Sequence, residues 1–406
     1  MSTHARDAAP MRVLYCLMCG LMLASSGCAR AQTVQTAAKK KVVMSKTATP
    51  RPSAAAVAWL KLKSLYDYDR KTPLGAQTID LQSDAIGSTR RMTIRGERGE
   101  TIPLIVVMPR GASAQKKVPG VVLLHGKDDD LNEVLMLFMA RSLAANGYAS
   151  LIPEVAKNDA QGKPKADPLS ADAALLRRSF IASIHDVRRT LDLFTAQPEI
   201  DATRIGLIGL SLGSIRGAVT TSVDTRIKTA VFLVGGADWP TILSQSEDPD
   251  TRAYHARYVR KSASERQRQD QILADVDPRN FVAHIASRPI LMINGTKDVL
   301  IPKASAQALF SAAREPKKQI WLPYGHFLST EVRPLIQSWI DEHLKPARAP
   351  MQAEKKTSGS ISASQTQAAP APQSVSTSPQ QAPLSAVAGT TSKMRVESAA
   401  RLQSAT

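Results

Sequence analysis

Between residues 90 and 345, short apolar runs alternate with longer segments in which apolar residues recur every three or four positions. The run VPGVVLL at 118–124 is apolar throughout, which is typical of a strand buried on both faces of a sheet. Segment 176–194 instead places its Leu, Phe, Ile and Val residues at helical spacing. Strands that alternate with helices predict an α/β fold with a mostly parallel sheet and helices on both of its faces.

The predicted strands are distributed along this whole region. A hairpin comes first, with strands at 90–94 and 104–107 around the turn at 96–99. Further strands are predicted at 118–124, 149–152, 205–208, 230–234, 289–293 and 319–322. In sheets of this kind, ligands bind beyond the carboxyl ends of the strands, so functional residues are expected in the loops that follow them.

Aromatic residues indicate the limits of the folded domain, which we place at 56–345. The chain has 406 residues, and 17 of its 18 Phe, Tyr and Trp residues lie between Trp59 and Trp339. Residues 32–55 are mostly small, basic or Pro, and they predict a flexible linker. Residues 346–406 are rich in Ala, Ser, Pro and Gln, and they predict a disordered tail.

An insertion at about 237–280 separates two of the predicted strands. It contains Trp239, Ile242, Tyr254 and Tyr258, followed by the polar run KSASERQRQDQ. Such a segment either lies over the functional site as a small helical cap or forms a pair of surface helices. The predicted architecture includes it as a cap.

A formal net charge of +18 raises the question of nucleic-acid binding. The two ends of the chain carry much of this excess, and no basic run in the folded region alternates with aromatic residues. We therefore predict no nucleic-acid partner and interpret the excess charge as solvated surface.

The first 31 residues resemble a cleavable export signal. Val13 to Ala24 form an apolar run behind Arg12, and Ala29-Arg30-Ala31 matches an A-x-A cleavage pattern. This run has only about half the length that a membrane-spanning helix needs. The protein is therefore predicted to be exported and to be periplasmic or secreted.

The cysteines offer a second interpretation of this segment. All three of them, Cys16, Cys19 and Cys28, lie in it, so the folded region has no cysteine nucleophile, disulfide or thiolate metal site. Residues 25–28 (SSGC) resemble a bacterial lipoprotein box with Cys28 as the lipidated residue, although Ser25 stands where Leu is usual. Cleavage after Ala31 and lipid anchoring through Cys28 both remain open.

The strongest chemical signal is the sequence Gly209-Leu210-Ser211-Leu212-Gly213, between a predicted strand and a predicted helix. A serine on a sharp strand-to-helix turn needs glycines on both sides, so that neighbouring backbones can pass closely. The turn presents the hydroxyl at the edge of the sheet, with the helix N-terminus directed at it. Ser211 is therefore a candidate nucleophile.

A serine nucleophile needs a base, and the base needs a group that orients it. His326 lies in a loop after the last predicted strand, and Asp298 follows the strand at 289–293. The chain order Ser211, Asp298, His326 is typical of one hydrolase fold. Asp238, which follows the strand at 230–234, is the alternative acid.

These motifs resemble the α/β-hydrolase superfamily, in particular its dienelactone-hydrolase-like and acetylxylan-esterase-like serine esterases. The resemblance covers residues 85–345, and its matching stretches are VVLLHG (121–126), ARSLAANGYASLIPE (140–154), RIGLIGLSLGS (204–214), PILMINGTKDVLIP (289–302) and YGHF (324–327). It implies Ser211 as nucleophile, His326 as base and Asp298 as acid. Dienelactone hydrolases themselves use a cysteine nucleophile, so the serine favours ordinary ester hydrolysis.

An oxyanion hole needs two backbone N–H groups that point at the developing negative charge. Leu212, the residue after the nucleophile, is expected to supply one. By similarity to the His-Gly motifs of the family, Lys127 in His125-Gly126-Lys127 is expected to supply the other. We predict neither a metal ion nor a cofactor.

Together these features predict an exported serine hydrolase, specifically a carboxylesterase that acts on a small-molecule ester through an acyl-enzyme. The sequence identifies neither the acyl part nor the alcohol part of the ester, nor the oligomeric state. One alternative is a serine peptidase of the prolyl-oligopeptidase type, although the chain lacks the length for the β-propeller of such enzymes. Another is a non-catalytic binding protein of the cell envelope on the same fold.

Overall fold

The computed structural model describes residues 53–127, 130–154, 172–249 and 251–345. The predicted signal peptide with Cys28, most of the predicted linker and the predicted tail lie outside the described residues. Within the described ranges, none of the helices combines the length and the hydropathy that a membrane span requires.

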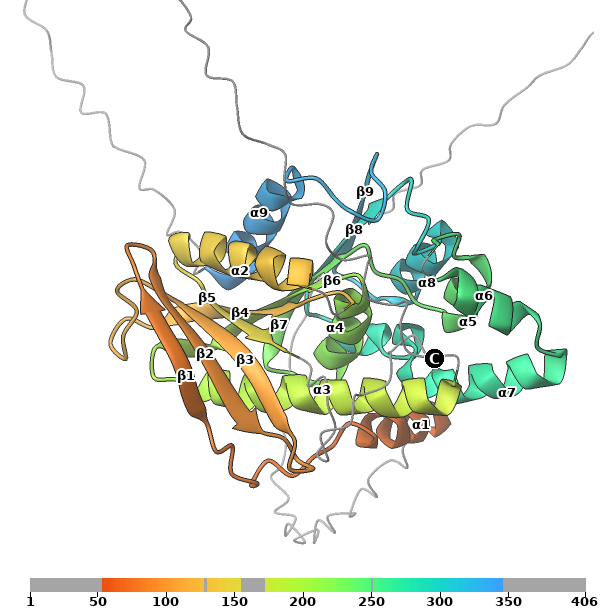
Figure 1. The fold of residues 1–406 in the computed structure, drawn as a ribbon, viewed down its shortest axis with the longest axis horizontal. Helices are drawn as coiled ribbons and strands as arrows, with labels where there is room; N and C mark the ends of the chain where they lie inside the picture. The colour runs from red at the N-terminus through yellow and green to blue at the C-terminus, as the bar shows by residue number, and fades with distance from the viewer. Residues whose placement is uncertain (1–52, 128–129, 155–171, 250, 346–406) are drawn as a thin grey trace, which may run out of the picture. The chain divides into compact units, whose positions relative to one another are not determined.

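A nine-stranded sheet runs through the molecule (Figure 1). Its strands are β1 (Gln77–Ser83), β2 (Gly87–Arg95), β3 (Thr101–Pro109), β4 (Val118–Leu124), β5 (Ala149–Pro153), β6 (Ile200–Leu210), β7 (Ile227–Leu233), β8 (Ile290–Gly295) and β9 (Lys317–Leu322). They lie in the order β1-β2-β3-β5-β4-β6-β7-β8-β9. The three pairs from β1 to β5 are antiparallel, and every later pair is parallel. The predicted α/β class with a mostly parallel sheet is confirmed.

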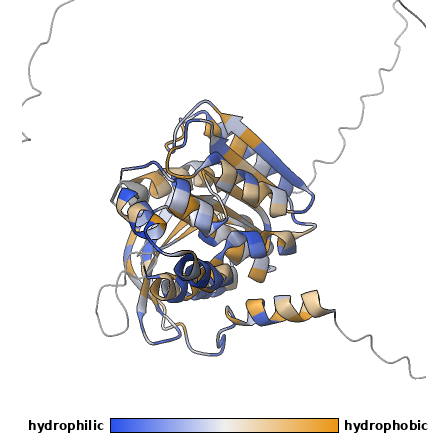
Figure 2. Ribbon diagram, turned by 90° about the vertical axis from the view of Figure 1, so that its right-hand side faces the viewer, coloured by the Kyte–Doolittle hydropathy of each residue, from blue (hydrophilic) through white to orange (hydrophobic). Residues whose placement is uncertain are grey.

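Helices cover both faces of this sheet. One face packs against α2 (Asp130–Ala145) and α9 (Val332–Leu344). The other face packs against α3 (Ala173–Ala196), α4 (Leu212–Val223) and α8 (Lys303–Ala312). Figure 2 shows that the outer helices carry both hydrophobic and hydrophilic residues, as expected where one side of a helix packs on a sheet and the other meets water.

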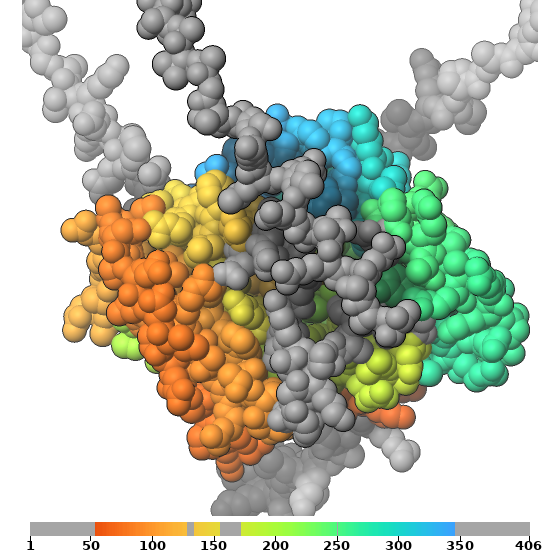
Figure 3. Space-filling model, in the orientation of Figure 1, coloured from red at the N-terminus to blue at the C-terminus, as the bar shows by residue number. Residues whose placement is uncertain are grey.

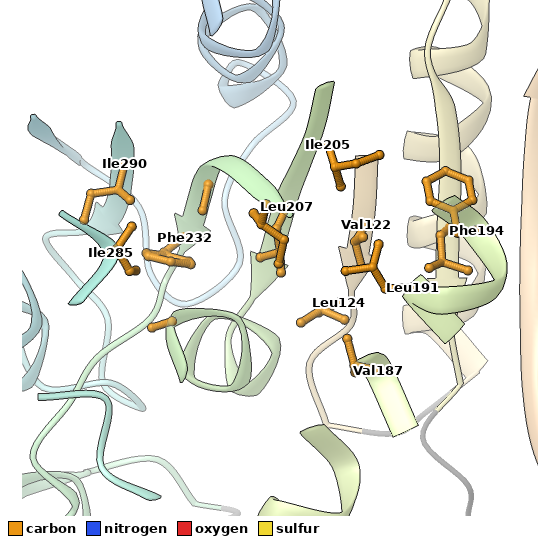
Figure 4. Packing of buried hydrophobic residues seen from close by; sticks show 14 of the residues in the cluster. Val122, Leu124, Val187, Leu191, Phe194, Ile205, Leu207, Phe232, Ile285 and Ile290 are labelled. Atoms are coloured by element: carbon orange, nitrogen blue, oxygen red, sulfur yellow. The ribbon is translucent and has the colours of Figure 1, made fainter. Parts of the chain in front are cut away.

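The pleat of β4 explains why its sequence is apolar at every position. Val121 and Leu123 pack into the layer with α2 and α9. Val122 and Leu124 point the opposite way, into the layer with α3 and α4 (Figure 4). Full burial of each such side chain contributes roughly 1.5–3 kcal/mol, so a polar residue anywhere in this strand would be costly.

Two elements at the start of the folded region differ from expectation. The helix α1 (Ala54–Ser64) begins inside the predicted linker, because Ser53 caps it by accepting the N–H of Ala56 at 3.2 Å. Strand β1 was not predicted. It lies at the sheet edge with Ile79 and Leu81 exposed, so it lacks the buried face that makes a strand visible in a sequence.

The segment at 237–280, predicted as a cap, forms α5 (Trp239–Gln245), α6 (Arg252–Val259), α7 (Ala263–Leu273) and two short 3-10 helices, Ala274–Val276 and Pro278–Asn280. Trp239 anchors it, since its ring is buried edge-on against Phe180 of α3 with centroids 6.1 Å apart. In Figure 3 these helices (green) lie on the opposite side of the visible face from β1–β3 (orange).

Ion pairs fix the C-terminal end of α4. The Asp224 carboxylate accepts hydrogen bonds from Arg188 Nε at 3.1 Å and from Arg226 Nη2 at 2.7 Å. Burial alone would raise the pKa of Asp224, but Arg226 and Arg188 outweigh that effect and lower the pKa to about 2. Because the carboxylate stays charged at neutral pH, it ties the C-terminal end of α4 to Arg188 of α3.

Candidate active site

Ser211 lies on the turn between β6 and α4, at the carboxyl end of a central strand. Its backbone angles are φ 54° and ψ −119°, a conformation that costs a residue with a side chain about 1–3 kcal/mol. Its N–H donates to the Leu233 carbonyl of β7 at 2.8 Å, and its own carbonyl accepts the N–H groups of Ser214 and Ile215. These bonds hold the strained turn in place.

Two glycines let this turn close. A Cβ atom at Gly213 would overlap the carbonyl oxygen of Leu124 at the end of β4. A Cβ atom at Gly209 would overlap the carbonyl oxygen of Gly213. The prediction that close backbone approach requires glycine on both sides of Ser211 is confirmed.

A chain of hydrogen bonds connects the three residues predicted to act together. His326 Nε2 lies 2.8 Å from Ser211 Oγ, and His326 Nδ1 lies 2.9 Å from Asp298 Oδ2. Ser211 follows β6, Asp298 follows β8 and His326 follows β9. Because these strands are parallel, their carboxyl ends lie at one edge of the sheet and bring Ser211 and His326 together across 115 positions of sequence.

The Asp298 carboxylate is held in a single orientation. Its side chain is only 3% exposed, against 12% for His326. Its Oδ1 atom accepts the backbone N–H groups of Leu300 and Ile301, both at 2.9 Å. These bonds fix the carboxylate so that both of its oxygens face His326 Nδ1, Oδ1 at 3.1 Å and Oδ2 at 2.9 Å.

Asp238, the alternative acid, makes different contacts. Its Oδ2 atom accepts the hydroxyl hydrogen of Thr241 at 2.8 Å and lies 3.4 Å from Arg279 Nη1. It occupies the N-cap position of α5 with a left-handed backbone. Across the described ranges, His326 is therefore bonded to Asp298 and not to Asp238.

A cavity of about 310 Å³ opens beside Ser211 and His326. The two predicted oxyanion-hole residues, Lys127 and Leu212, both line it. Leu212 is the first residue of α4, so its N–H has no acceptor one turn earlier in the helix. Lys127 follows β4, whose last carbonyl contacts Gly213, so the loop that carries Lys127 passes beside the turn of Ser211.

The cavity walls are mainly apolar and come from both faces of the sheet. On the side of α4, they include Ile215 together with Trp239 and Ile242 of the segment at 237–280. On the other side, they come from α2, from the loop after His326 and from α9. An uncharged organic substrate fits such a cavity better than a highly charged one.

The part that α2 plays in this wall was not predicted from the sequence. Residues of α2 that line the cavity recur at helical spacing: Leu135, Phe138, Met139, Ser142 and Leu143. A neighbouring stripe packs on the sheet: Met136, Ala140 and Leu143. The sequence does contain one sign of this second role: α2 is apolar over a wider arc than a helix with a single buried face needs.

This combination of a mostly parallel sheet, helices on both faces and a serine on a strained strand-to-helix turn defines an α/β-hydrolase. The model of the Dienelactone hydrolase family matches residues 105–322, more than half of the chain. The chain therefore belongs to the dienelactone hydrolase family and is a hydrolase of esterase type.

Individual relatives agree with this placement. The putative esterase YitV of Bacillus subtilis (strain 168) is 22% identical over 220 residues, which cover 52% of this chain and 81% of YitV. The acetyl xylan esterase from Paenibacillus sp. R4 superposes with a TM-score of 0.59 at 21% identity, over 71% of this chain and 94% of that one. Acetyl xylan esterase 1 from Thermoanaerobacterium sp. JW/SL YS485 gives a TM-score of 0.55 at 17% identity, over 72% and 94% of the two chains. The predicted resemblance and fold are confirmed.

Proposed function

We propose that the protein is an exported serine carboxylesterase that hydrolyses small-molecule esters through an acyl-enzyme. One observation carries this proposal: an unbroken hydrogen-bond chain runs from Ser211 through His326 to the buried Asp298, beside an apolar cavity. A serine hydroxyl is a weak nucleophile until a base removes its proton, and His326 Nε2 is at hydrogen-bond distance for that transfer.

In the first half of the reaction, Ser211 Oγ attacks the ester carbonyl carbon while its proton passes to His326 Nε2. The N–H groups of Leu212 and Lys127 donate to the carbonyl oxygen as it becomes negative. Asp298 accepts the Nδ1 hydrogen of His326, which keeps Nε2 free to take the proton and stabilises the imidazolium. The bond to the alcohol oxygen then breaks, and His326 returns the proton to that oxygen.

In the second half, water replaces the alcohol. His326 Nε2 removes one proton from the water, and the hydroxide attacks the acyl carbon of the acyl-enzyme. The bond between the acyl carbon and Ser211 Oγ breaks, Oγ regains a proton from His326, and the carboxylic acid leaves. The free enzyme is then restored.

A fluorophosphonate probe tests this assignment, because it reacts with a serine that a neighbouring base activates. We expect the probe to label the wild type and not Ser211→Ala, as measured by intact mass. Ser329→Ala is the matched control and should keep the label, since Ser329 lines the same cavity but its Oγ accepts the Glu331 N–H at 3.2 Å. Equal labelling of the wild type and Ser211→Ala would contradict the proposal.

A substrate panel separates the esterase from the two alternatives. We expect turnover of p-nitrophenyl esters and none of proline-containing peptides. Peptide turnover without ester turnover would support the peptidase. Failure of every acyl donor, together with specific binding to cell walls, would support the envelope-binding protein.

Export is proposed from the apolar run at 13–24 and the small residues that follow it. We expect intact-mass measurement of protein from the native envelope and periplasmic fractions to show a chain that begins at Gln32 or at a lipidated Cys28. A soluble cytoplasmic protein that retains Met1 would contradict export.

A further inference from the structure

On the side of α2 and α9, the cavity beside Ser211 continues between the two helices. We call this part the α2–α9 slot and define it by Leu135, Phe138, Met139 and Ser142 of α2 with Val332 and Ile336 of α9. Both helices pack on the same face of the sheet. The slot is therefore bounded by two helices that the core holds in place.

The side chains around the slot expose much apolar surface to water. Phe327, the residue after His326, is 84% exposed, while Phe138 and Leu135 are 52% and 39% exposed. All three line the cavity. Single exposed apolar side chains scattered over a surface are normal. Several of them gathered around one pocket instead indicate a surface that a ligand covers.

Arg333 connects the two helices at the slot. Its guanidinium lies over the Phe138 ring, 5.0 Å from the ring centroid, and its Nη2 donates to Ser142 Oγ at 3.4 Å. These contacts join the first turn of α9 to the second half of α2. They link the two helices beside the slot, while the sheet holds the inner side of both helices. A space between two packed helices suits a slender ligand such as an unbranched chain.

We propose that the α2–α9 slot binds the unbranched apolar chain of an ester substrate, so that the enzyme prefers esters with a chain of several methylene groups over acetyl esters. This inference rests on the proposed esterase function, because the slot opens into the cavity that holds Ser211. The slot would hold a flexible alkyl chain in either of two cases: the chain belongs to the acyl part of the ester or to its alcohol part.

Two ester series test the preference in the wild type. One varies the acyl chain of p-nitrophenyl esters from acetyl to octanoyl, and the other varies the alcohol chain of alkyl acetates from methyl to octyl. Burial of a methylene contributes about 0.8 kcal/mol, which corresponds to roughly a fourfold rise in kcat/KM for each methylene the slot accepts. We expect such a rise in one series, which identifies the part of the ester that the slot holds. Flat profiles in both series would overturn the inference.

Filling the slot tests its location. Ser142→Phe places a ring between α2 and α9, and we expect it to lower the ratio of long-chain to short-chain kcat/KM by at least about tenfold. Ala145→Phe is the matched control, because Ala145 is an exposed residue of the same helix outside the cavity lining, and it should keep the wild-type ratio. Met139→Trp fills the slot from a second position and should repeat the effect if Ser142→Phe lowers the melting temperature. A ratio unchanged in both filled variants, each folded, would overturn the inference.

Failure of this inference is distinguishable from failure of the proposed function. Absence of ester hydrolysis and of probe labelling in the wild type would contradict the proposed function and the slot assignment together. Normal probe labelling and acetyl ester hydrolysis without any chain-length dependence would leave the esterase proposal standing and contradict the slot alone.

Discussion

Replacing Asp298 by Asn is expected to lower kcat for an ester substrate by about 10⁴ and to leave KM nearly unchanged. The carboxylate accepts the hydrogen of His326 Nδ1, whereas an amide NH₂ group would donate to that nitrogen and move the ring hydrogen to Nε2. An Nε2 that already carries a hydrogen cannot take the proton of Ser211. Steady-state hydrolysis of p-nitrophenyl esters by wild type and Asp298→Asn measures the loss.

Asp238→Asn is the matched control for this experiment. The Asp238 carboxylate contacts Thr241 and Arg279, so we expect its amide to change kcat by no more than a few fold. The assignment of Asp298 would be wrong if Asp238→Asn abolished turnover while Asp298→Asn retained it, with circular dichroism showing both variants folded.

Gly213→Ala is expected to reduce both the free energy of unfolding and the esterase rate. Gly213 lies in α4, where helix propensity alone would favour Ala by about 1 kcal/mol. The added methyl group, however, would overlap the Leu124 carbonyl oxygen, a backbone atom of β4. Overpacking of this kind costs roughly 1–3 kcal/mol or more, so we expect a net loss in urea unfolding experiments.

Gly217→Ala controls for the effect of helix propensity in Gly213→Ala. Gly217 also lies in α4, but an added Cβ there would meet the Leu207 Cδ2 atom at 2.7 Å, the movable end of a side chain. We expect a smaller loss of unfolding free energy and an esterase rate close to that of the wild type. Equal losses in the two variants would mean that contact with the β4 backbone is not what excludes a side chain at 213.

The sequence was most informative where burial constrains a residue on all sides. Strands such as β4, buried on both faces, have no polar positions and are visible as continuous apolar runs. Asp298 was visible because it follows such a strand, β8, and Ser211 because it follows the buried apolar second half of β6. The strand before His326, β9, is only half-buried, so His326 was found from its place in the loop between that strand and the C-terminal helix. The edge strand β1 was missed because its side chains are largely exposed and its composition carries little signal.

The sequence could not decide between Asp298 and Asp238 as the partner of His326. That choice depends on how each loop is shaped in three dimensions, which residue types alone do not show. Asp298 and Asp238 both follow parallel strands, and chain order alone does not separate them. In the structure, the N–H groups of Leu300 and Ile301 orient Asp298 toward His326, while a left-handed turn directs Asp238 to the start of α5. The α2–α9 slot escaped prediction for a similar reason, because it depends on how two helices whose starts are 202 positions apart in the chain pack on one sheet face.

The parallel pairing of β6, β7, β8 and β9 has a consequence for how the protein folds. None of the hydrogen bonds between Ser211, His326 and Asp298 is local: they span 115 and 28 positions of the chain. Closing such long loops costs conformational entropy before any contact repays it, and parallel pairing is correspondingly slow. A chain whose helices have formed but whose last strands are undocked has no nucleophile–base pair at all. Hydrolytic activity therefore reports completion of the sheet, and helix content during refolding does not.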